Sequence, residues 1–433
     1  MAKDTRPEIA IIGGGQLGLM IAEEAHNLGA RVAVLDPSAD APAFAAADRH
    51  VVGQYDDIKA LEKLCDGCDV VTYEFENVPG EVLRHIESRY NIKQGVQPLF
   101  DSQDRLREKA NARIHGLKTP GFIPVPALDF MTPEDGGESI PGNPEYPVPM
   151  TADDAASLDR RERLHQIKEA VRVLGMPCVL KTRTMGYDGH GQYVIREEKD
   201  LEPASDLLAV PCILEKFVDF DYEASVVMVS DGEKTIHFPI GRNIHTDGIL
   251  DLCVVPAPGL SDGLAENVAG KKIAAACEAF MKSCGYKGIL AIELFIKGDD
   301  FYFNEMAPRP HNSGHYTIEG CSASQYRELC HFLLGMPLED PLLLAPTVMK
   351  NILGKDLDAA KEIVAESLEG AGPGVSVSDP DDVDNAFCGQ AGPGVFVHLY
   401  GKIQSRPKRK MGHITFTPMT LSDFNVKWAD RFV

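Results

Sequence analysis

The segment from Glu8 to Asp36 constrains the fold of this chain most strongly. A short apolar run to Ile12 is followed by the glycine-rich sequence Gly13-Gly-Gly15-Gln-Leu-Gly18, a helical pattern, and a second apolar run that ends at Asp36. Glycines at these spacings let the backbone turn tightly from a strand into a helix and approach a phosphate group at the helix N-terminus. The pattern therefore predicts a βαβ unit with parallel strands at the start of the chain.

The same pattern leaves the ligand open. It strongly indicates a Rossmann-like unit, but it indicates NAD only weakly, so an NAD-dependent oxidoreductase built on residues 13–36 stays one interpretation. The sequence Val70-Val-Thr-Tyr-Glu74-Phe-Glu-Asn-Val-Pro79 predicts a further strand and loop. Glu74 would then lie where open α/β sheets bind ligands, although the loop could simply begin the helix expected from Pro79 to Arg89.

The stretch from Ala291 to His315 combines acids, an amide and a rigid loop. It predicts a hairpin in which one strand carries Glu293, the turn is Gly298-Asp299-Asp300, and the return strand ends in Asn304-Glu305. Two carboxylates and an amide suit Mg²⁺. The alternative is an ordinary amphipathic hairpin with solvated acids. The following loop, Pro308 to His315, presents Arg, Asn, Ser and His beside the acids and favours the metal site.

A glycine-rich turn lies between two predicted strands near the middle of the chain. The strand Cys178–Lys181 ends in a lysine, and Thr184 to Gln192 has the sequence TMGYDGHGQ. Because the pattern GxxxxGK[ST] is absent, we interpret this turn as a flexible flap over ATP phosphates, with Lys181 as a point charge. A plain glycine hairpin is the alternative. The strand Cys212–Val218 would hold an adenine edge, and Glu223 would bind ribose hydroxyls.

Composition restricts the classes of partner. The formal net charge is −22, which disfavours nucleic acid and anionic membranes. The chain has no apolar run long enough to span a membrane and no signal-peptide core at its N-terminus, so we expect a soluble cytoplasmic protein. The ten cysteines are scattered, and the Cys65/Cys68 pair lacks a second pair or a histidine, which favours reduced thiols over a metal or redox site.

The remaining elements are predicted from periodicity and from start and stop signals. The range 132–159 is rich in Pro, Gly and acids without a period, and we expect a mobile insertion there. From about Val348 the sequence predicts short strands. We expect helices over 102–115, 160–174, 261–284 and 324–334, and strands over 224–230, 234–239 and 251–256, with His245 in a turn.

Taken in order, these motifs resemble the ATP-grasp superfamily. Lys181, the GYDGHGQ flap, Glu215-Lys-Phe-Val218, Glu223, Glu293 and Asn304-Glu305 carry this resemblance. More narrowly, EFENVP, NEMAPRPHNSGH and the tail YGK…RKMGH resemble 5-(carboxyamino)imidazole ribonucleotide synthases of purine biosynthesis. The resemblance covers nearly the whole chain. It differs at His190, where many members carry Arg or Lys.

The resemblance implies a mixed α/β and α+β fold. Residues 1–117 would form a Rossmann-like pre-ATP-grasp domain, 118–345 an ATP-grasp domain of two subdomains with the flap subdomain at about 118–220, and 346–433 a small β-rich domain. The implied enzyme is a carbon–nitrogen ligase, a homodimer, that carboxylates 5-aminoimidazole ribonucleotide with bicarbonate and ATP through carboxyphosphate. Mg²⁺, or Mn²⁺ in its place, would be the cofactor.

The resemblance also implies roles for individual residues. Those implied for ATP are Lys109, Lys181, Gly186, Tyr187, Asp188, Gly189, His190, Gly191, Gln192, Glu215, Lys216, Phe217, Val218, Glu223, His245, Asn304 and Glu305. Glu293 and Glu305 would bind the metal, and Arg309, Asn312 and Asp188 would act in catalysis. Those implied for the ribonucleotide are Gly15, Gln16, Leu17, Glu74, Tyr187, Asp188, His190, Lys402 and Arg409.

Three alternatives remain at this point. One is another ATP-grasp ligase, such as a formate-dependent glycinamide ribonucleotide transformylase or a biotin-carboxylase-like protein. The NAD-dependent oxidoreductase is the second, and it would leave Glu293, Glu305 and the flap without roles. The third is a catalytically dead ATP-binding regulator, in which the pair of acids would be expected to be broken.

Overall fold

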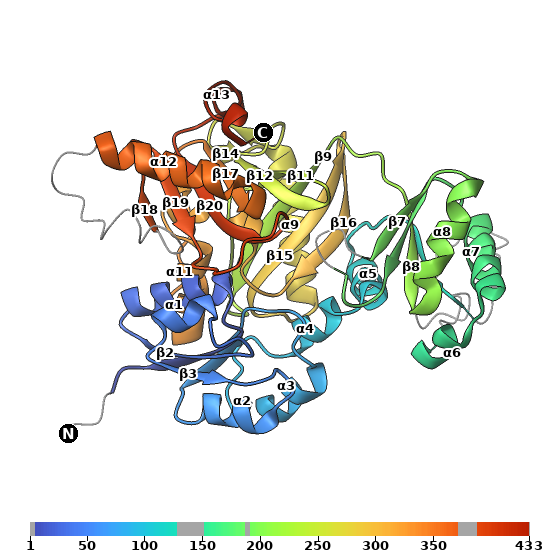
Figure 1. Cartoon of the computed structure of the whole chain (residues 1–433), viewed down its shortest axis with the longest axis horizontal. Coiled ribbons are helices and arrows are strands. Elements are labelled where there is room, and N and C mark those ends of the chain that lie inside the picture. Colours follow the sequence, from blue (N-terminus) through green and yellow to red (C-terminus); the bar gives the residue numbers. More distant parts are fainter. Residues whose placement is uncertain (1–4, 128–150, 187–190, 371–387, 433) are drawn as a thin grey trace. The chain divides into compact units, whose positions relative to one another are not determined.

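The computed structural model describes residues 5–127, 151–186, 191–370 and 388–432 (Figure 1). The chain forms two compact units, each made of discontinuous segments. Unit 1 contains Met1–Val96, Ala224–Ala291 and Ala307–Val433, and unit 2 contains Gln97–Glu223 and Ile292–Met306. No helix within the described ranges is long and apolar enough to cross a membrane.

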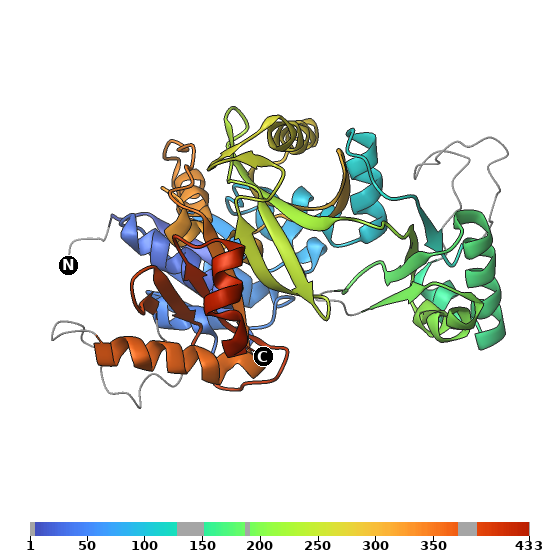
Figure 2. The same cartoon turned by 90° about the horizontal axis from the view of Figure 1, so that it is seen from above.

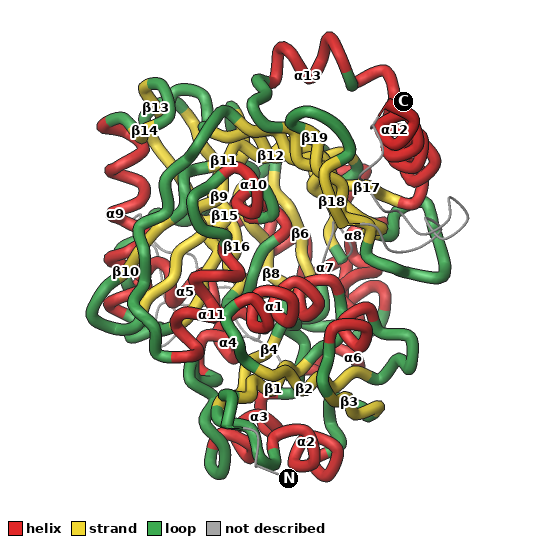
Figure 3. Tube along the Cα trace, turned by 90° about the vertical axis from the view of Figure 1, so that its left-hand side faces the viewer, coloured by secondary structure: helices red, strands yellow, loops and turns green. Residues whose placement is uncertain are grey.

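Unit 1 begins with the predicted βαβ unit. Its parallel sheet has the strand order β3-β2-β1-β4. Helix α1 lies on one face of this sheet, and α2 and α3 lie on the other (Figures 1 and 3). Burial on both faces explains why β1 and β2 are apolar throughout their interiors. The elements are β1 Glu8–Ile12, α1 Gln16–Asn27, β2 Arg31–Asp36, β3 Arg49–Val52, α2 Ile58–Cys65, β4 Val70–Tyr73 and α3 Gly80–Glu87.

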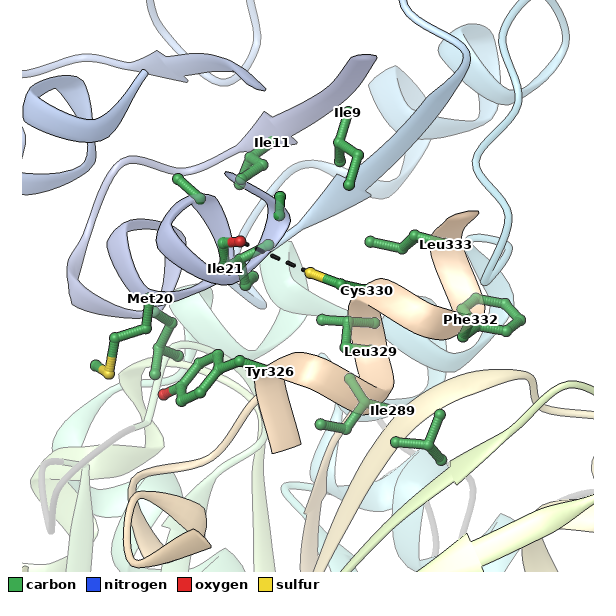
Figure 4. Packing of buried hydrophobic residues seen from close by; sticks show 14 of the residues in the cluster. Ile9, Ile11, Met20, Ile21, Ile289, Tyr326, Leu329, Cys330, Phe332 and Leu333 are labelled. Atoms are coloured by element: carbon green, nitrogen blue, oxygen red, sulfur yellow. Dashed lines mark hydrogen bonds between the residues drawn. The ribbon is translucent and has the colours of Figure 1, made fainter. Parts of the chain in front are cut away.

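Helix α1 packs against a helix from much later in the chain, α11 (Gln325–Leu334). Ile21 and Met20 on α1 lie beside Tyr326, Leu329 and Cys330 on α11 (Figure 4). The Cys330 thiol donates to the carbonyl oxygen of Ile21, with the sulfur 3.7 Å from the oxygen. This core fixes the glycine-rich turn at the start of α1 to the rest of unit 1.

The remainder of unit 1 is dominated by antiparallel strands. Their order is β9-β11-β12-β17-β20-β19-β18, and β10 pairs with β9. The bounds are β9 Tyr222–Ser230, β10 Thr235–His237, β11 Gly241–Thr246, β12 Ile249–Val255, β13 Ser261–Asp262, β14 Ala265–Glu266, α9 Val268–Ser283, α10 Thr317–Gly320, β17 Thr347–Leu353, α12 Leu357–Gly370, β18 Cys388–Gln390, β19 Val395–Leu399, β20 Lys410–Phe416 and α13 Leu421–Lys427.

Unit 2 contains a four-stranded sheet of order β5-β8-β6-β7. Helices α7 and α8 supply Ile167, Val171 and Leu201 to a core against one face of it (Figures 1 and 2). The adjacent strands β15 and β16 form the predicted hairpin. The bounds are α4 Gln97–Ser102, α5 Arg105–Ile114, β5 Phe122–Val125, α6 Ala152–Ser157, α7 Arg160–Leu174, β6 Cys178–Thr182, β7 Gln192–Ile195, α8 Leu201–Ser205, β8 Cys212–Lys216, β15 Gly288–Lys297 and β16 Asp300–Ala307.

Several predicted elements were wrong in type or extent. The helix expected over 261–284 begins only at Val268, because Asn267 caps it, and the residues before it form the β13–β14 hairpin. Of the expected insertion 132–159, residues 132–150 lie outside the described residues. The rest is ordered: α6 starts at a Thr151 cap, and Asp159 caps α7.

The C-terminal region is less purely β than expected. Helix α12 was missed, although Ala360, Ile363 and Val364 show helical spacing and lie in a core with strands β17, β19 and β20. His245 does not lie in a turn. It lies on strand β11, and the turn follows at Asp247-Gly248, where both residues have positive φ.

Candidate active site

Two lysines and one glutamate form a buried charged cluster in unit 2. The Glu215 side-chain oxygen Oε2 lies 3.0 Å from Lys181 Nζ and 3.3 Å from Lys109 Nζ. The three residues come from β8, β6 and α5, and all are buried. Burial alone would raise the pKa of Glu215, but the two lysine charges outweigh it and hold the pKa below its ordinary value. Two cations share one carboxylate, so the cluster carries a surplus positive charge.

The predicted hairpin supplies polar atoms to the same cluster. Lys109 Nζ donates to the backbone oxygen of Asn304 at 2.7 Å, and Lys181 Nζ lies 3.4 Å from the Asn304 side-chain oxygen. Next along β16, Glu305 Oε2 accepts a hydrogen bond from Arg105 at 2.7 Å. The structure therefore brings together four of the predicted ATP-site residues, Lys109, Lys181, Glu215 and Asn304, with Glu305 as the next residue of the strand.

Helix α5 contributes two further residues that the sequence analysis missed. Arg105 pairs with Glu305, and the Glu108 carboxylate accepts a hydrogen bond from the backbone N–H of Met306. Burial raises the pKa of Glu108, and the charge of Glu305 adds to that shift. The spacing of Arg105 and Glu108 from Lys109 places all three on neighbouring turns of one helix, which was the available signal.

The donor set on the hairpin fits a hard divalent cation. Glu293 lies on β15 and Glu305 on β16, both are half-buried, and the Glu305 side chain is 39% exposed. Two carboxylates beside an amide oxygen are oxygen ligands of the kind Mg²⁺ takes when substrate phosphates complete its coordination. No group of three or more His, Cys, Asp or Glu side chains gathers as a metal site in the described part of the chain. A metal here would therefore depend on the nucleotide for its remaining ligands.

Several other residues predicted for ATP adjoin strands β6, β7 and β8 of unit 2. Gly186 ends the described part of the flap, Gly191 and Gln192 resume it, and Tyr187, Asp188, Gly189 and His190 lie outside the described residues. Lys216, Phe217 and Val218 follow Glu215 at the end of β8, where Phe217 N–H donates to the Pro177 carbonyl. Glu223 lies on β9 in unit 2, whereas His245 belongs to unit 1.

In unit 1, the glycine-rich turn is bound by carboxylates of the chain itself. The backbone N–H of Gly14 donates to Asp36 at 2.8 Å, and that of Gly15 donates to Glu74 at 3.0 Å. A Cβ added at Gly13, which has a φ of +107°, would lie 2.6 Å from Glu74 Cγ. Asp36 also accepts from Tyr55. The amides that would bind a dinucleotide pyrophosphate are thus engaged, which argues against the NAD interpretation.

Several residues predicted for the ribonucleotide meet near this turn. Lys402 Nζ donates to the Gln16 side-chain oxygen at 2.9 Å and to the Lys410 carbonyl at 2.7 Å. Burial and the charges of Arg409 and Lys410 lower the Lys402 pKa to about 8. Leu17, by contrast, points its side chain into the core of unit 1. Arg409 donates to the Gln404 carbonyl and is exposed.

Side chains of the loop after β16 are held by contacts within unit 1. Arg309 forms a two-pronged ion pair with Glu76, in which Nη2 lies 2.8 Å from Oε1. Burial would raise the Glu76 pKa, but Arg309 outweighs it and lowers the pKa below its usual value. Asn312 Oδ1 lies 2.9 Å from the buried ring of His315. Glu76 and His315 thus hold two of the three predicted catalytic side chains, and neither Glu76 nor His315 was predicted for a role in the site.

Family comparisons cover each region of the chain. Residues 7–101 match a ribonucleotide synthetase preATP-grasp domain, 155–326 an ATP-grasp domain, and 347–425 a phosphoribosylaminoimidazole carboxylase C-terminal domain. An N5-carboxyaminoimidazole ribonucleotide synthase from Staphylococcus epidermidis is 36% identical over 94% of this chain and 91% of its own length. The chain belongs to the N5-carboxyaminoimidazole ribonucleotide synthase family. Its fold is therefore the predicted one, with pre-ATP-grasp, ATP-grasp and C-terminal domains.

Solved structures of synthases in this family agree. One from Staphylococcus aureus, complexed with ADP, has a TM-score of 0.77 and 32% identity, covering 99% of this chain and 97% of its own. One from Aspergillus clavatus, in complex with ADP and 5-aminoimidazole ribonucleotide, has a TM-score of 0.75 and 26% identity, covering 97% and 96%. The domain boundaries predicted above at 117 and 345 stay predictions.

Proposed function

We propose that this chain is an ATP-dependent ligase that carboxylates 5-aminoimidazole ribonucleotide with bicarbonate, in purine biosynthesis. The family membership supports this activity. The structural observation that supports it best is the cluster in unit 2, where Lys109 and Lys181 contact the buried carboxylate of Glu215 and both lysines also contact Asn304. That arrangement concentrates positive charge beside a pair of acids, as a metal–triphosphate complex requires.

In this proposal the cluster binds the phosphates of ATP. Lys109 and Lys181 supply positive charge, and one oxygen of Glu215 holds both ammonium groups in place. Because the Glu215 side chain contacts the lysines, residues 216–218 would bind adenine. Glu223 binds the ribose, and the flap from Gly186 to Gln192 covers the phosphates. His245 stays a sequence-based candidate for the nucleotide.

Glu293 and Glu305 would hold Mg²⁺, or Mn²⁺ in its place, with Asn304 adjacent. When bound, such an ion neutralises the triphosphate charge that builds up during phosphoryl transfer. Arg105 has a defined part in this arrangement. Its guanidinium pairs with Glu305 at 2.7 Å and neutralises one carboxylate of the proposed pair. In this proposal the Glu305 carboxylate is therefore paired with Arg105 when no metal ion is bound, and it can bind the ion when Mg²⁺-ATP arrives.

The second set of residues, in unit 1, would bind the ribonucleotide and bicarbonate. Gly15, Gln16 and Glu74 come from the glycine-rich turn and the loop after β4, and Lys402 and Arg409 would hold the phosphate. The contact between Lys402 and Gln16 supports their joint assignment. Arg309 and Asn312, fixed by Glu76 and His315, would position bicarbonate or carboxyphosphate.

The proposed chemistry has two stages. A bicarbonate oxygen attacks the γ-phosphorus of ATP and releases ADP, giving carboxyphosphate. The carbon–oxygen bond of carboxyphosphate then breaks, giving CO₂ and phosphate beside the exocyclic amine of the substrate, which attacks CO₂ and loses a proton. A closed flap, to which Tyr187, Asp188 and His190 would contribute, keeps water away from the labile intermediate.

The dependence of ADP release on the two acceptors tests this function. We expect ADP release to require both 5-aminoimidazole ribonucleotide and bicarbonate. Formate with glycinamide ribonucleotide should not replace them, which separates the transformylase alternative. ADP release that responds to formate, or to neither acceptor, would reject the proposed substrate pair while leaving ATP binding intact.

A further inference from the structure

A cysteine, a histidine and a glutamate are aligned in the C-terminal part of unit 1. The Cys388 sulfur lies 3.0 Å from Nδ1 of His398, and Nε2 of His398 lies 2.6 Å from Glu319 Oε1. The thiol and the carboxylate thus contact opposite nitrogens of one imidazole. We propose that Cys388, His398 and Glu319 form a reactive-thiol site, in which Cys388 is a nucleophile that takes soft electrophiles.

Strand pairing builds this arrangement. Cys388 on the edge strand β18 lies directly opposite His398 on β19, and His398 lies opposite His413 on β20 (Figure 1). Directly paired residues of antiparallel strands point to the same face and come within reach of each other. Helix α10 adds Glu319 to that face. The geometry therefore rests on regular secondary structure on both sides of the histidine.

Exposure distinguishes Cys388 from the other thiols. All ten cysteines lie in the described ranges, and Cys388 is the exposed one, since the rest are buried or half-buried. His398 and Glu319 are largely covered, with side chains 10% and 11% exposed. Glu319 Oε2 has no hydrogen-bond partner among the described residues, so its charge is directed at His398. An accessible thiol backed by a covered base and acid is the arrangement that activates a cysteine nucleophile.

The charges around the site favour an imidazolium at His398. Burial lowers the His398 pKa, but its hydrogen bonds to Cys388 and Glu319 outweigh burial and raise it to about 10. Burial keeps His413 well below its ordinary pKa, so this stacked neighbour stays neutral. Glu23 also faces His398. Burial raises the Glu23 pKa, while the charge of His398 acts in the opposite direction.

The reaction with an electrophile is balanced within the site. In the proposed reaction His398 Nδ1 takes the thiol proton, and the Cys388 sulfur donates an electron pair to the electrophilic carbon. With iodoacetamide as the probe, a sulfur–carbon bond forms, the carbon–iodine bond breaks, and iodide leaves with the bonding electrons. Glu319 compensates the imidazolium charge throughout.

Alkylation of the whole protein by iodoacetamide, followed peptide by peptide with mass spectrometry, tests the proposal. The thiolate fraction of an ordinary cysteine falls by more than about 100-fold between about pH 8.5 and about pH 6, as glutathione in the same buffer will show. We expect the Cys388 rate to fall by less than about tenfold over this range. In His398→Gln the steep fall should return, and Glu319→Gln should lie between the two.

Cys68 provides the matched control. It is half-buried and contacts Arg49 and Glu8 rather than a histidine, and burial raises its pKa to about 12. Cys68→Ser should leave Cys388 labelling unchanged, and Cys68 itself should react more slowly at each pH. A wild-type Cys388 profile as steep as that of glutathione would overturn the proposal. So would a shallow profile that persists in a folded His398→Gln protein. If His398→Gln does not fold, the test uses the pH profiles of Cys388 alkylation in the wild-type protein and in Glu319→Gln, and a Glu319→Gln profile as shallow as that of the wild type would then overturn the proposal.

Discussion

At the scale of single residues, the proposed nucleotide site is a problem of buried charge. Lys109 and Lys181 would be costly to bury alone, and Glu215 offsets that cost by contacting both. All three residues were predicted for the nucleotide, but the contact of Glu215 with both lysines was not, because a strand pattern does not reveal which distant lysines a carboxylate meets. Arg105, Glu108 and Glu76 were missed for the same reason, since each acquires its role from a partner far away in the chain.

Replacing Glu215 with Gln tests this charge balance. The substitution leaves two buried ammonium groups without a carboxylate, so we expect a loss of about 3 kcal/mol in the free energy of unfolding. Glu278→Gln removes one member of the surface pair Glu278–Lys282 and should cost less than about 0.5 kcal/mol. Chemical denaturation of both variants makes the comparison. Equal losses in the two would show that Glu215 does not hold the cluster together.

Glu305→Gln tests the metal site. It keeps the side-chain shape and removes one of the two proposed ligand charges, so turnover with Mg²⁺-ATP should fall by roughly a thousandfold or more while the fold survives. Asp300→Asn, on the same strand, breaks only the exposed pair with Lys118 and should leave turnover near that of the unaltered chain. Near-normal ADP release by folded Glu305→Gln would refute the assignment.

Glu74 predicts a pH dependence of stability. Burial raises its pKa from 4.5 to about 7, although the Gly15 amide and Arg309 act the other way. The pKa of Glu74 is higher in the folded state than in the unfolded state, so the folded state binds the Glu74 proton more tightly. The resulting contribution to the free energy of unfolding is fully present below about pH 4.5 and is lost as the pH rises through about 7.

Glu74→Gln stays neutral at every pH and should lose this dependence. At about pH 8 the variant should be more stable than the unaltered chain by up to about 3 kcal/mol, and near pH 4.5 the two should agree. Unfolding midpoints across this range provide the measurement, with exposed Glu81→Gln as the control. Parallel curves for Glu74→Gln and the unaltered chain would contradict the prediction.

At the scale of elements, the sequence predicted those whose signals are local. The β1–α1–β2 unit follows from its glycines, α7 from the stop signal at Gly175 and Pro177, and the β15–β16 hairpin from its Gly/Asp turn. Elements fixed by distant packing were predicted poorly. Helix α12 is stabilised by the C-terminal strands, and His245 lies on β11 because β12 continues its pairing up to Thr246.

The flap carries a prediction of its own. The sequence places glycines at positions 186, 189 and 191, and glycine permits backbone conformations that other residues rarely adopt, so we predict that nucleotide binding slows amide exchange over residues 184–192. Amide hydrogen exchange in this segment should slow by about tenfold or more when ATP and Mg²⁺ bind. Exchange in helix α9 should be the same with and without ATP and Mg²⁺. Unchanged exchange over 184–192 at saturating ATP would remove the flap from the proposal.

At the scale of the whole molecule, order along the chain was predictable and division into units was not. The three matched regions follow the predicted sequence of domains. The compact units are instead assembled from discontinuous segments, and the chain changes unit within β15 and within β16. Only contacts between distant segments decide such a division. The homodimer, the Mg²⁺ requirement and the cytoplasmic location stay predictions.

The central claim is that this chain joins a carboxyl group from bicarbonate to the exocyclic amine of 5-aminoimidazole ribonucleotide. The most direct measurement supplies ¹³C-bicarbonate, ATP and the ribonucleotide and follows the label by NMR. We predict that the label appears in a carbamate carbon bonded to that amine nitrogen, with one ADP released for each carbamate formed. Labelled carbon that stays in bicarbonate while ADP accumulates, or a product that takes its carbon from added formate, would contradict the claim.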